Sequence, residues 1–162
     1  MACSSSLNKP RFDVISNLDD SIVSIIEGKE FLYYTKGHHG HIWSLVVSEK
    51  ERYILISGNT RKNDCLRSDT IYTSEPILKW GLDTMKLYCH KMKPVEKSSY
   101  WPFYERLVLL SSSREPIFDC TETDTYSGTD GVIFNKKLNE LKYFMYWNAV
   151  PTEIQEKLPS PR

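Results

Sequence analysis

The sequence lacks several features that would assign it to a large class of proteins. No stretch approaches the roughly 20 apolar residues of a transmembrane helix, and no P-loop or dinucleotide-binding fingerprint is present. An excess of one charge is also missing, because Lys+Arg and Asp+Glu both number 21 and the formal net charge is zero. A protein that neutralises many phosphates needs a basic excess or a dense basic face. The sequence therefore predicts neither a nucleic-acid partner nor a cofactor.

Cysteine is scarce, and its spacing excludes two common uses. The four cysteines are Cys3, Cys65, Cys89 and Cys120. They lie too far apart for a C-x-x-C zinc or redox motif. The last three allow at most one disulfide bond and leave one free thiol. Of these, Cys65 is the best candidate for a reactive thiol, because several basic residues lie near it in the sequence and such neighbours lower a thiol pKa.

The composition is that of one globular domain. A chain of 162 residues with 40% hydrophobic and 26% charged residues is long and apolar enough to bury a full core. Residues 1–19 are expected to form a flexible leader, and residues 20–150 a single domain. Residues 151–162 contain three prolines and many charges, which predicts a polar C-terminal tail.

Residues rich in β-branched and aromatic side chains predict strands in the first third of the chain. The expected strands are 22–26, 30–35, 41–48 and 52–57. Short polar or glycine-containing breaks separate them, and the turn signal Gly58-Asn59 follows the last strand, so the simplest arrangement is an antiparallel meander. Residues 59–73 are polar, and we expect them to form a loop.

One helix is expected over about 75–92. Ser74 is expected to cap it, and Pro76 fits its first turn, where the missing N–H costs nothing. Gly81 weakens the helix by about 1 kcal/mol relative to Ala and permits close packing. Apolar residues at steps of four and three positions form one stripe that packs on a sheet. The stripe consists of Leu78, Leu82, Met85, Cys89 and Met92.

The second half of the chain is expected to return to strands. Residues 107–110 predict a buried strand and residues 116–118 a short edge strand that begins at a proline. Residues 131–134 and 141–147 predict a hairpin, with a helix over 136–147 as the alternative. The predicted fold class is α+β, a mostly antiparallel sheet of about six to eight strands with one principal helix, about 75–92, packed on it.

The first ten residues carry the one resemblance to a known family. Ala2 precedes Cys3, and residues 4–10 are polar and rich in serine. This segment resembles the start of a mature bacterial lipoprotein, in which the cysteine carries the lipid and the following residues form a tether. The resemblance implies a lipid on Cys3, a periplasmic or surface location at the cell envelope, and membrane contact only through that lipid. A cytoplasmic protein is the alternative.

Two segments are candidate metal sites. His38, His39 and His41 lie in a glycine-containing turn, and neutral imidazole binds zinc, nickel or copper. In an extended conformation His39 and His41 share a face while His38 lies opposite, so we expect a solvated polar turn, with a metal site as the alternative. Acidic residues between 119 and 130 offer oxygen ligands for calcium, but their spacing misses the EF-hand pattern and predicts a solvated loop.

An aromatic run at residues 100–104 is the candidate partner surface. A central proline keeps the run out of regular structure, and exposed Trp and Tyr rings stack on sugars or anchor protein interfaces. The residues expected to contact a protein partner or a glycan are Tyr100, Trp101, Phe103 and Tyr104. The alternative is a loop that packs these rings under the edge of the sheet.

These patterns favour a binding protein over an enzyme. No G-x-S-x-G elbow is present, and no residue is assigned a catalytic role. The leading hypothesis is a non-enzymatic, envelope-anchored binding or interaction protein, such as an immunity-type inhibitor or an accessory lipoprotein. The alternatives are a metal-assisted hydrolase that uses the histidine cluster and a carbohydrate-binding module that uses the 100–104 loop.

Overall fold

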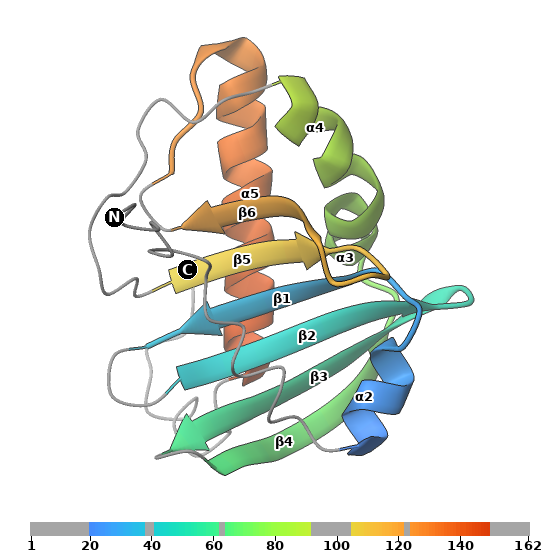
Figure 1. The fold of residues 1–162 in the computed structure, drawn as a ribbon. Coiled ribbons are helices and arrows are strands. Elements are labelled where there is room, and N and C mark those ends of the chain that lie inside the picture. Colours follow the sequence, from blue (N-terminus) through green and yellow to red (C-terminus); the bar gives the residue numbers. More distant parts are fainter. Residues whose placement is uncertain (1–19, 38–40, 62–63, 92–104, 122–123, 150–162) are drawn as a thin grey trace, which may run out of the picture.

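The computed structural model describes residues 20–37, 41–61, 64–91, 105–121 and 124–149, which form one antiparallel sheet and three helical segments (Figure 1). The strands are β1 (Phe31–Lys36), β2 (His41–Glu49), β3 (Arg52–Arg61), β4 (Asp64–Thr73), β5 (Glu105–Leu110) and β6 (Pro116–Thr121). Their order across the sheet is β4-β3-β2-β1-β5-β6. The predicted α+β class, with a mostly antiparallel sheet and helical elements packed on it, is confirmed.

The strands β1, β2 and β3 form the later part of the expected meander, and β4 extends it by a strand that the sequence did not predict. Lys50 adopts a φ of 56° in the tight turn between β2 and β3. The loop predicted at 59–73 is wrong, because β3 continues to Arg61 and β4 extends from Asp64 to Thr73. The pairing of β3 with β4 shifts register between Ser57 and Gly58, so this glycine marks an irregularity within a strand. β4 forms one edge of the sheet, where polar residues are normal.

The strands β5 and β6 extend the sheet on the other side of β1. β5 pairs directly with β1, which places Glu105 opposite Lys36. β6 begins at Pro116 and forms the second edge of the sheet, in agreement with the predicted edge strand. In β6, Asp119 is bound by the guanidinium of Arg106, so it does not belong to a solvated acidic loop.

The strand predicted at 22–26 is wrong, because these residues belong to the helix α2 (Asp20–Ile26). The helix buries Ile22 and Ile26, which are four residues apart and therefore share one helical face. β-branched residues favour strands only weakly, and burial of one apolar face is enough to override that preference. Gly28, with a φ of 65°, follows the helix and reverses the chain toward β1.

The helix predicted at 75–92 is confirmed over 76–91, as three consecutive segments. These are α3 (Pro76–Lys79), the π-helical turn η1 (Trp80–Thr84) and α4 (Met85–Lys91). Leu78, Leu82 and Met85 are buried as the stripe requires. The predicted cap at Ser74 is wrong, because Glu75 is the N-cap residue and its side chain makes no capping hydrogen bond. The side chain of Cys89 and all of Met92 lie outside the described part of the molecule.

Gly81 allows this helical segment to approach the sheet and the last helix closely. A Cβ atom at this position would lie 2.8 Å from Leu32 Cδ1 and 2.9 Å from Leu141 Cδ2. Carbon atoms in ordinary contact lie about 3.5 to 4.0 Å apart. The close packing predicted for Gly81 is therefore confirmed.

The hairpin predicted from 131–134 and 141–147 is wrong, because both segments lie in the long helix α5 (Gly128–Ala149). The alternative helical prediction over 136–147 is correct but too short. The buried residues of α5 recur at steps of three and four positions: Phe134, Leu138, Leu141, Met145 and Ala149. The helix packs on β1, β2 and β3, and Ser57 Oγ donates a hydrogen bond to the carbonyl oxygen of Asn148 at 3.1 Å.

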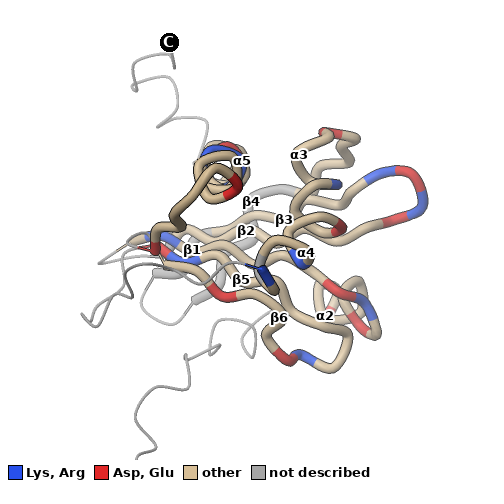
Figure 2. The backbone as a smooth tube through the Cα atoms, turned by 90° about the horizontal axis from the view of Figure 1, so that it is seen from above, with Lys and Arg blue, Asp and Glu red and all other residues tan. Residues whose placement is uncertain are grey.

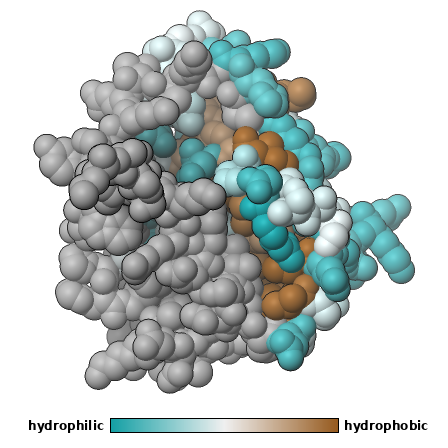
Figure 3. All heavy atoms as spheres, viewed as in Figure 1, coloured by the Kyte–Doolittle hydropathy of each residue, from teal (hydrophilic) through white to brown (hydrophobic). Residues whose placement is uncertain are grey.

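The sheet separates two hydrophobic cores. One face packs against α5 and the 76–91 segment, around residues such as Leu32 and Phe134. The other face packs against α2 and contains Trp43 and Phe31. Viewed from above, α5 and α3 lie on one side of the sheet and α2 on the other, with acidic and basic residues interleaved along the described backbone (Figure 2). On the face seen in Figure 3, hydrophobic side chains of the described residues lie directly beside hydrophilic ones.

Candidate functional site

Most residues that the sequence marks as candidates lie outside the described part of the molecule. These are Cys3, His38, His39, Tyr100, Trp101, Phe103 and Tyr104. His41 begins β2, but its side chain is not among those described. The lipid site, the histidine metal site and the aromatic partner surface therefore stay predictions. Among the described residues, no three His, Cys, Asp or Glu side chains lie close enough together to hold a metal ion.

Cys120 is buried, and its environment makes the thiol a poor nucleophile. It lies in β6 on the face that packs against α5, and its Sγ donates a hydrogen bond to the carbonyl oxygen of Thr121 at 3.2 Å. Burial raises the pKa of this thiol to about 12, although the nearby Lys142 ammonium acts in the opposite direction. The nucleophilic thiolate is therefore almost absent at neutral pH. Cys65 lies in β4, and its side chain is not among those described.

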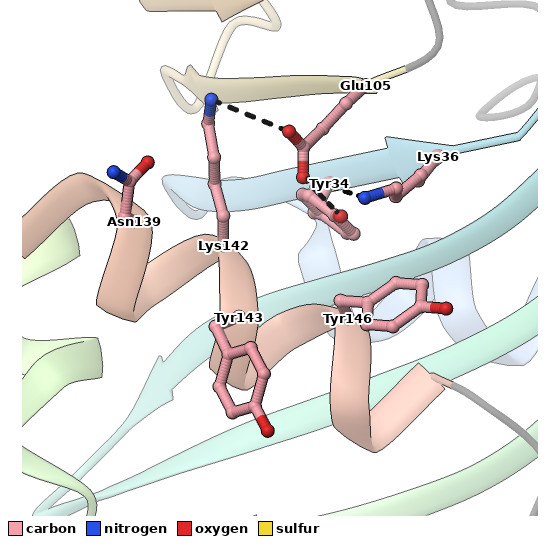
Figure 4. A pocket seen from close by; sticks show the side chains of 7 residues that line it. All are labelled: Tyr34, Lys36, Glu105, Asn139, Lys142, Tyr143 and Tyr146. Carbon is pink, nitrogen blue, oxygen red and sulfur yellow. Dashed lines mark hydrogen bonds and ion pairs between the residues drawn. The ribbon is translucent and has the colours of Figure 1, made fainter. Parts of the chain in front are cut away.

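Polar and aromatic side chains gather at the junction between α5 and the sheet, where β1 ends and β5 begins (Figure 4). They line a recess of about 190 Å³, which we call the tyrosine–lysine recess. Its residues are Tyr34, Lys36, Glu105, Asn139, Lys142, Tyr143 and Tyr146. The strands supply the first three, and α5 supplies the other four.

The carboxylate of Glu105, on the strand side of the recess, interacts with three neighbours, Tyr34, Lys36 and Lys142 (Figure 4). The hydroxyl of Tyr34 donates a hydrogen bond of 2.7 Å to Oε1. The ammonium groups of Lys36 and Lys142 lie 3.8 Å from Oε1 and 3.9 Å from Oε2. These two distances are too long for direct hydrogen bonds, so the lysines act on the carboxylate mainly through their charge.

Lys142 is the most unusual residue of the site, because lysine is rarely buried. Only 7% of its side chain is exposed. Its ammonium donates one hydrogen bond, of 3.4 Å, to the carbonyl oxygen of Thr121. An ammonium group carries three donors, and a buried charge is costly unless it is paired. The helix thus holds a positive charge at a fixed place beside Glu105.

Aromatic rings form the side of the recess contributed by α5. The ammonium of Lys36 lies 5.0 Å from the centre of the Tyr146 ring, within the range of a cation–π contact. Tyr143 is 47% exposed and stacks on Trp147, with ring centres 6.2 Å apart and planes inclined by 15°. Stacking on Trp147 restrains the orientation of an otherwise exposed ring.

Helical spacing explains how α5 builds its side of the recess. Asn139, Lys142, Tyr143 and Tyr146 are separated by three, one and three positions, so they lie on one face of the helix. Sequence reasoning missed this face because it favoured a hairpin for the segment. The signal was nevertheless present as polar and tyrosine residues repeating at helical spacing beside the apolar stripe.

A second recess, of about 520 Å³, lies around the turn between β2 and β3. It is lined by Tyr72 of β4 and by the charged residues 49–52. Lys29 binds Glu49 at 2.9 Å and lowers the pKa of its carboxyl group. No residue lining this recess is buried, so packing does not fix the positions of its polar groups. The tyrosine–lysine recess contains two buried residues, Tyr34 and Lys142, and is therefore better preorganised.

No described helix is both long enough and apolar enough to cross a bilayer. Comparison of the chain with protein-family models, with curated proteins and with solved structures finds no match, so the site has to be interpreted from its own geometry.

Proposed function

We propose that the protein is a non-enzymatic binding protein whose site is the tyrosine–lysine recess and whose ligand is a glycan. One observation carries the proposal. Tyrosine rings, a carboxylate, two ammonium groups and an amide line the same small recess, and two of the residues involved are buried. Of the hypotheses that the sequence allows, binding of a glycan agrees best with this set of side chains.

The chemistry of the lining matches that of a hydroxyl-rich ligand. A sugar hydroxyl both donates and accepts hydrogen bonds, and the recess offers acceptors on Glu105 and donors on Asn139 and the lysines. The faces of Tyr143 and Tyr146 suit the apolar face of a sugar ring. A small number of positioned polar groups among aromatic walls is the usual composition of a small-molecule site.

A glycan array probed with the full chain tests the proposal. We expect binding of a defined set of glycans by the wild type and its loss in Tyr143→Ala, which removes an exposed wall without opening the core. The matched control is Tyr72→Ala, an exposed tyrosine of β4 outside the recess. A blank array would contradict the proposal. Loss of binding in Tyr72→Ala but not in Tyr143→Ala would contradict the proposal and indicate that the ligand binds in the recess around the β2–β3 turn.

We also propose that this binding takes place at the bacterial cell envelope, because Ala2-Cys3-Ser4 resembles the lipidation site of a lipoprotein. The test is metabolic labelling with a clickable fatty acid in cells that express the gene with its own upstream region. Label that is present in the wild type and absent in Cys3→Ser is the expected result. A wild-type chain without label would contradict the envelope location.

A further inference from the structure

The tyrosine–lysine recess carries more positive than negative charge. Lys36 and Lys142 each contribute one positive charge, and Glu105 contributes one negative charge, which leaves one net positive charge among the lining residues. The recess is only partly open to solvent, since the side chains of Lys142 and Glu105 are 7% and 15% exposed. Charges in such a place are screened by water much less than charges on an open surface.

The positive charge has hydrogen-bonding capacity left for a ligand. Within the described residues, the Lys142 ammonium makes one long hydrogen bond, and Lys36 contacts Glu105 and Tyr146 without a hydrogen bond of ordinary length. Glu105 Oε1 already accepts a hydrogen bond from Tyr34. A second carboxylate, brought by a ligand, would bind the donors that Glu105 does not use and would neutralise the net charge.

The size of the recess limits what accompanies that carboxylate. A volume of 190 Å³ corresponds to roughly six water molecules at their share of liquid volume, which is on the scale of a single sugar ring. The recess therefore fits one residue at an end or a branch of a glycan. The ring of Tyr146 lies beside the ammonium of Lys36 and is placed to contact the body of that sugar ring, whereas Tyr143 lines the recess farther from Lys142 (Figure 4).

We infer that the tyrosine–lysine recess recognises an acidic sugar, whose carboxylate binds the ammonium group of Lys142, with Lys36 as the second cation, while its ring contacts Tyr146. This inference rests on the proposed function and adds the class of ligand. It makes Lys142 the residue that determines the preference for an acidic over a neutral sugar. Glu105 sets the strength of that preference, because it cancels part of the positive charge.

Titration calorimetry of the full chain with methyl glucuronide and methyl glucoside tests the inference, because these probes differ in the carboxylate. We expect the glucuronide to bind at least about tenfold more tightly, since a charge-assisted hydrogen bond in a partly buried site has that effect. Lys142→Met should abolish this difference. Lys136→Met, an exposed lysine of the same helix outside the recess, is the matched control and should retain it.

Glu105→Gln provides a test in the opposite direction and does not depend on the folding of the Lys142 variant. The amide can still accept the hydrogen bond from Tyr34, but the negative charge is gone. The variant should therefore bind the glucuronide at least about threefold more tightly than the wild type. Unchanged or weaker binding in Glu105→Gln would overturn the inference.

The two sugars separate failure of the inference from failure of the proposed function. Equal binding of glucuronide and glucoside, lost in Tyr143→Ala, would overturn the inference and leave the glycan-binding function supported. Binding of neither sugar, together with a blank glycan array, would overturn both. N-acetylneuraminate added as a competitor identifies the source of the carboxylate: displacement of the glucuronide indicates acidic sugars in general, and no displacement indicates uronic acids.

Discussion

Replacement of Gly81 by alanine has two opposing effects of similar size on the free energy of unfolding. Alanine favours a helix over glycine by about 1 kcal/mol, so the helical propensity alone predicts a more stable protein. The structure adds an opposing effect, because the new Cβ would lie 2.8 Å from Leu32 Cδ1 and 2.9 Å from Leu141 Cδ2. Both leucines are fully buried, and their methyl groups would have to move by about 0.6 to 0.7 Å to reach the short limit of ordinary contact.

Overpacking of this kind costs about 1 to 3 kcal/mol in a well-packed core. Subtracting the gain in propensity leaves an expected loss of about 0 to 2 kcal/mol in the free energy of unfolding for Gly81→Ala. Urea denaturation followed by circular dichroism measures it, provided that the slope of the transition does not change. A loss in the upper half of this range moves the midpoint measurably in a domain whose total stability is about 5 to 15 kcal/mol.

A double-mutant cycle with Leu141→Val identifies the cause. Valine lacks one carbon of leucine and gives the new Cβ room, so Gly81→Ala should be less harmful in this background than in the wild type. If Gly81→Ala alone raises the free energy of unfolding by about 1 kcal/mol, helical propensity dominates and the reasoning from close packing is refuted. Equal effects in the two backgrounds would also refute it.

Three further predictions concern the core, a thiol and an ion pair. Phe134→Ala should lower the free energy of unfolding by about 3 to 5 kcal/mol in urea denaturation, because the ring is fully buried among four other aromatic rings; a loss below about 1 kcal/mol would contradict this packing. Cys120 should resist iodoacetamide at pH 8 in the folded protein and react in urea, because folding raises the pKa of its thiol to about 12; site-resolved mass spectrometry measures both reactions. The stability that comes from burying the neutral thiol is present below the ordinary pKa of 9.0 and is lost as pH rises toward 12. Lys29→Met should raise the NMR-measured pKa of Glu49 toward its ordinary 4.5, because the hydrogen bond and charge of Lys29 lower that pKa in the wild type. The stability that this pair contributes to the wild type is present above pH 4.5 and is lost as pH falls through the lowered pKa. An unchanged pKa in the variant would show that the contact is absent in solution.

The fold was predictable where one residue pattern dominates. Alternating or continuous β-branched and aromatic residues identified β1, β2 and β5, and the apolar stripe identified the helix over 76–91. The errors occurred where two patterns compete. In α5 the aromatic and β-branched residues favour strands, but burial follows the helical spacing of residues such as Phe134, Leu138 and Leu141. The edge strand β4 contains polar residues because of its place in the sheet, which its own sequence does not show.

The site was much less predictable than the fold. Lys36, Glu105 and Lys142 lie on β1, β5 and α5, and only the pairing of β1 with β5 brings the first two together. No short motif contains all three, and each is an ordinary charged residue in the sequence. What the sequence offered instead were concentrated patterns, such as the histidine cluster around His39 and the aromatic run around Trp101. Both lie outside the described residues and stay predictions.

The π-helical turn at 80–84 has a consequence for how the chain tolerates changes in length. The N–H of Met85 donates to the carbonyl oxygen of Trp80, five residues earlier, so this turn holds one residue more than an α-helical turn. In a plain α-helix an extra residue would rotate everything that follows by about 100°. Leu78 and Met85, seven positions apart across this turn, both reach the same core. A deletion of one residue within 80–84 would leave these two residues six positions apart, which an α-helix rotates by about 600°, so they would no longer share one face and the apolar stripe would be broken at this point.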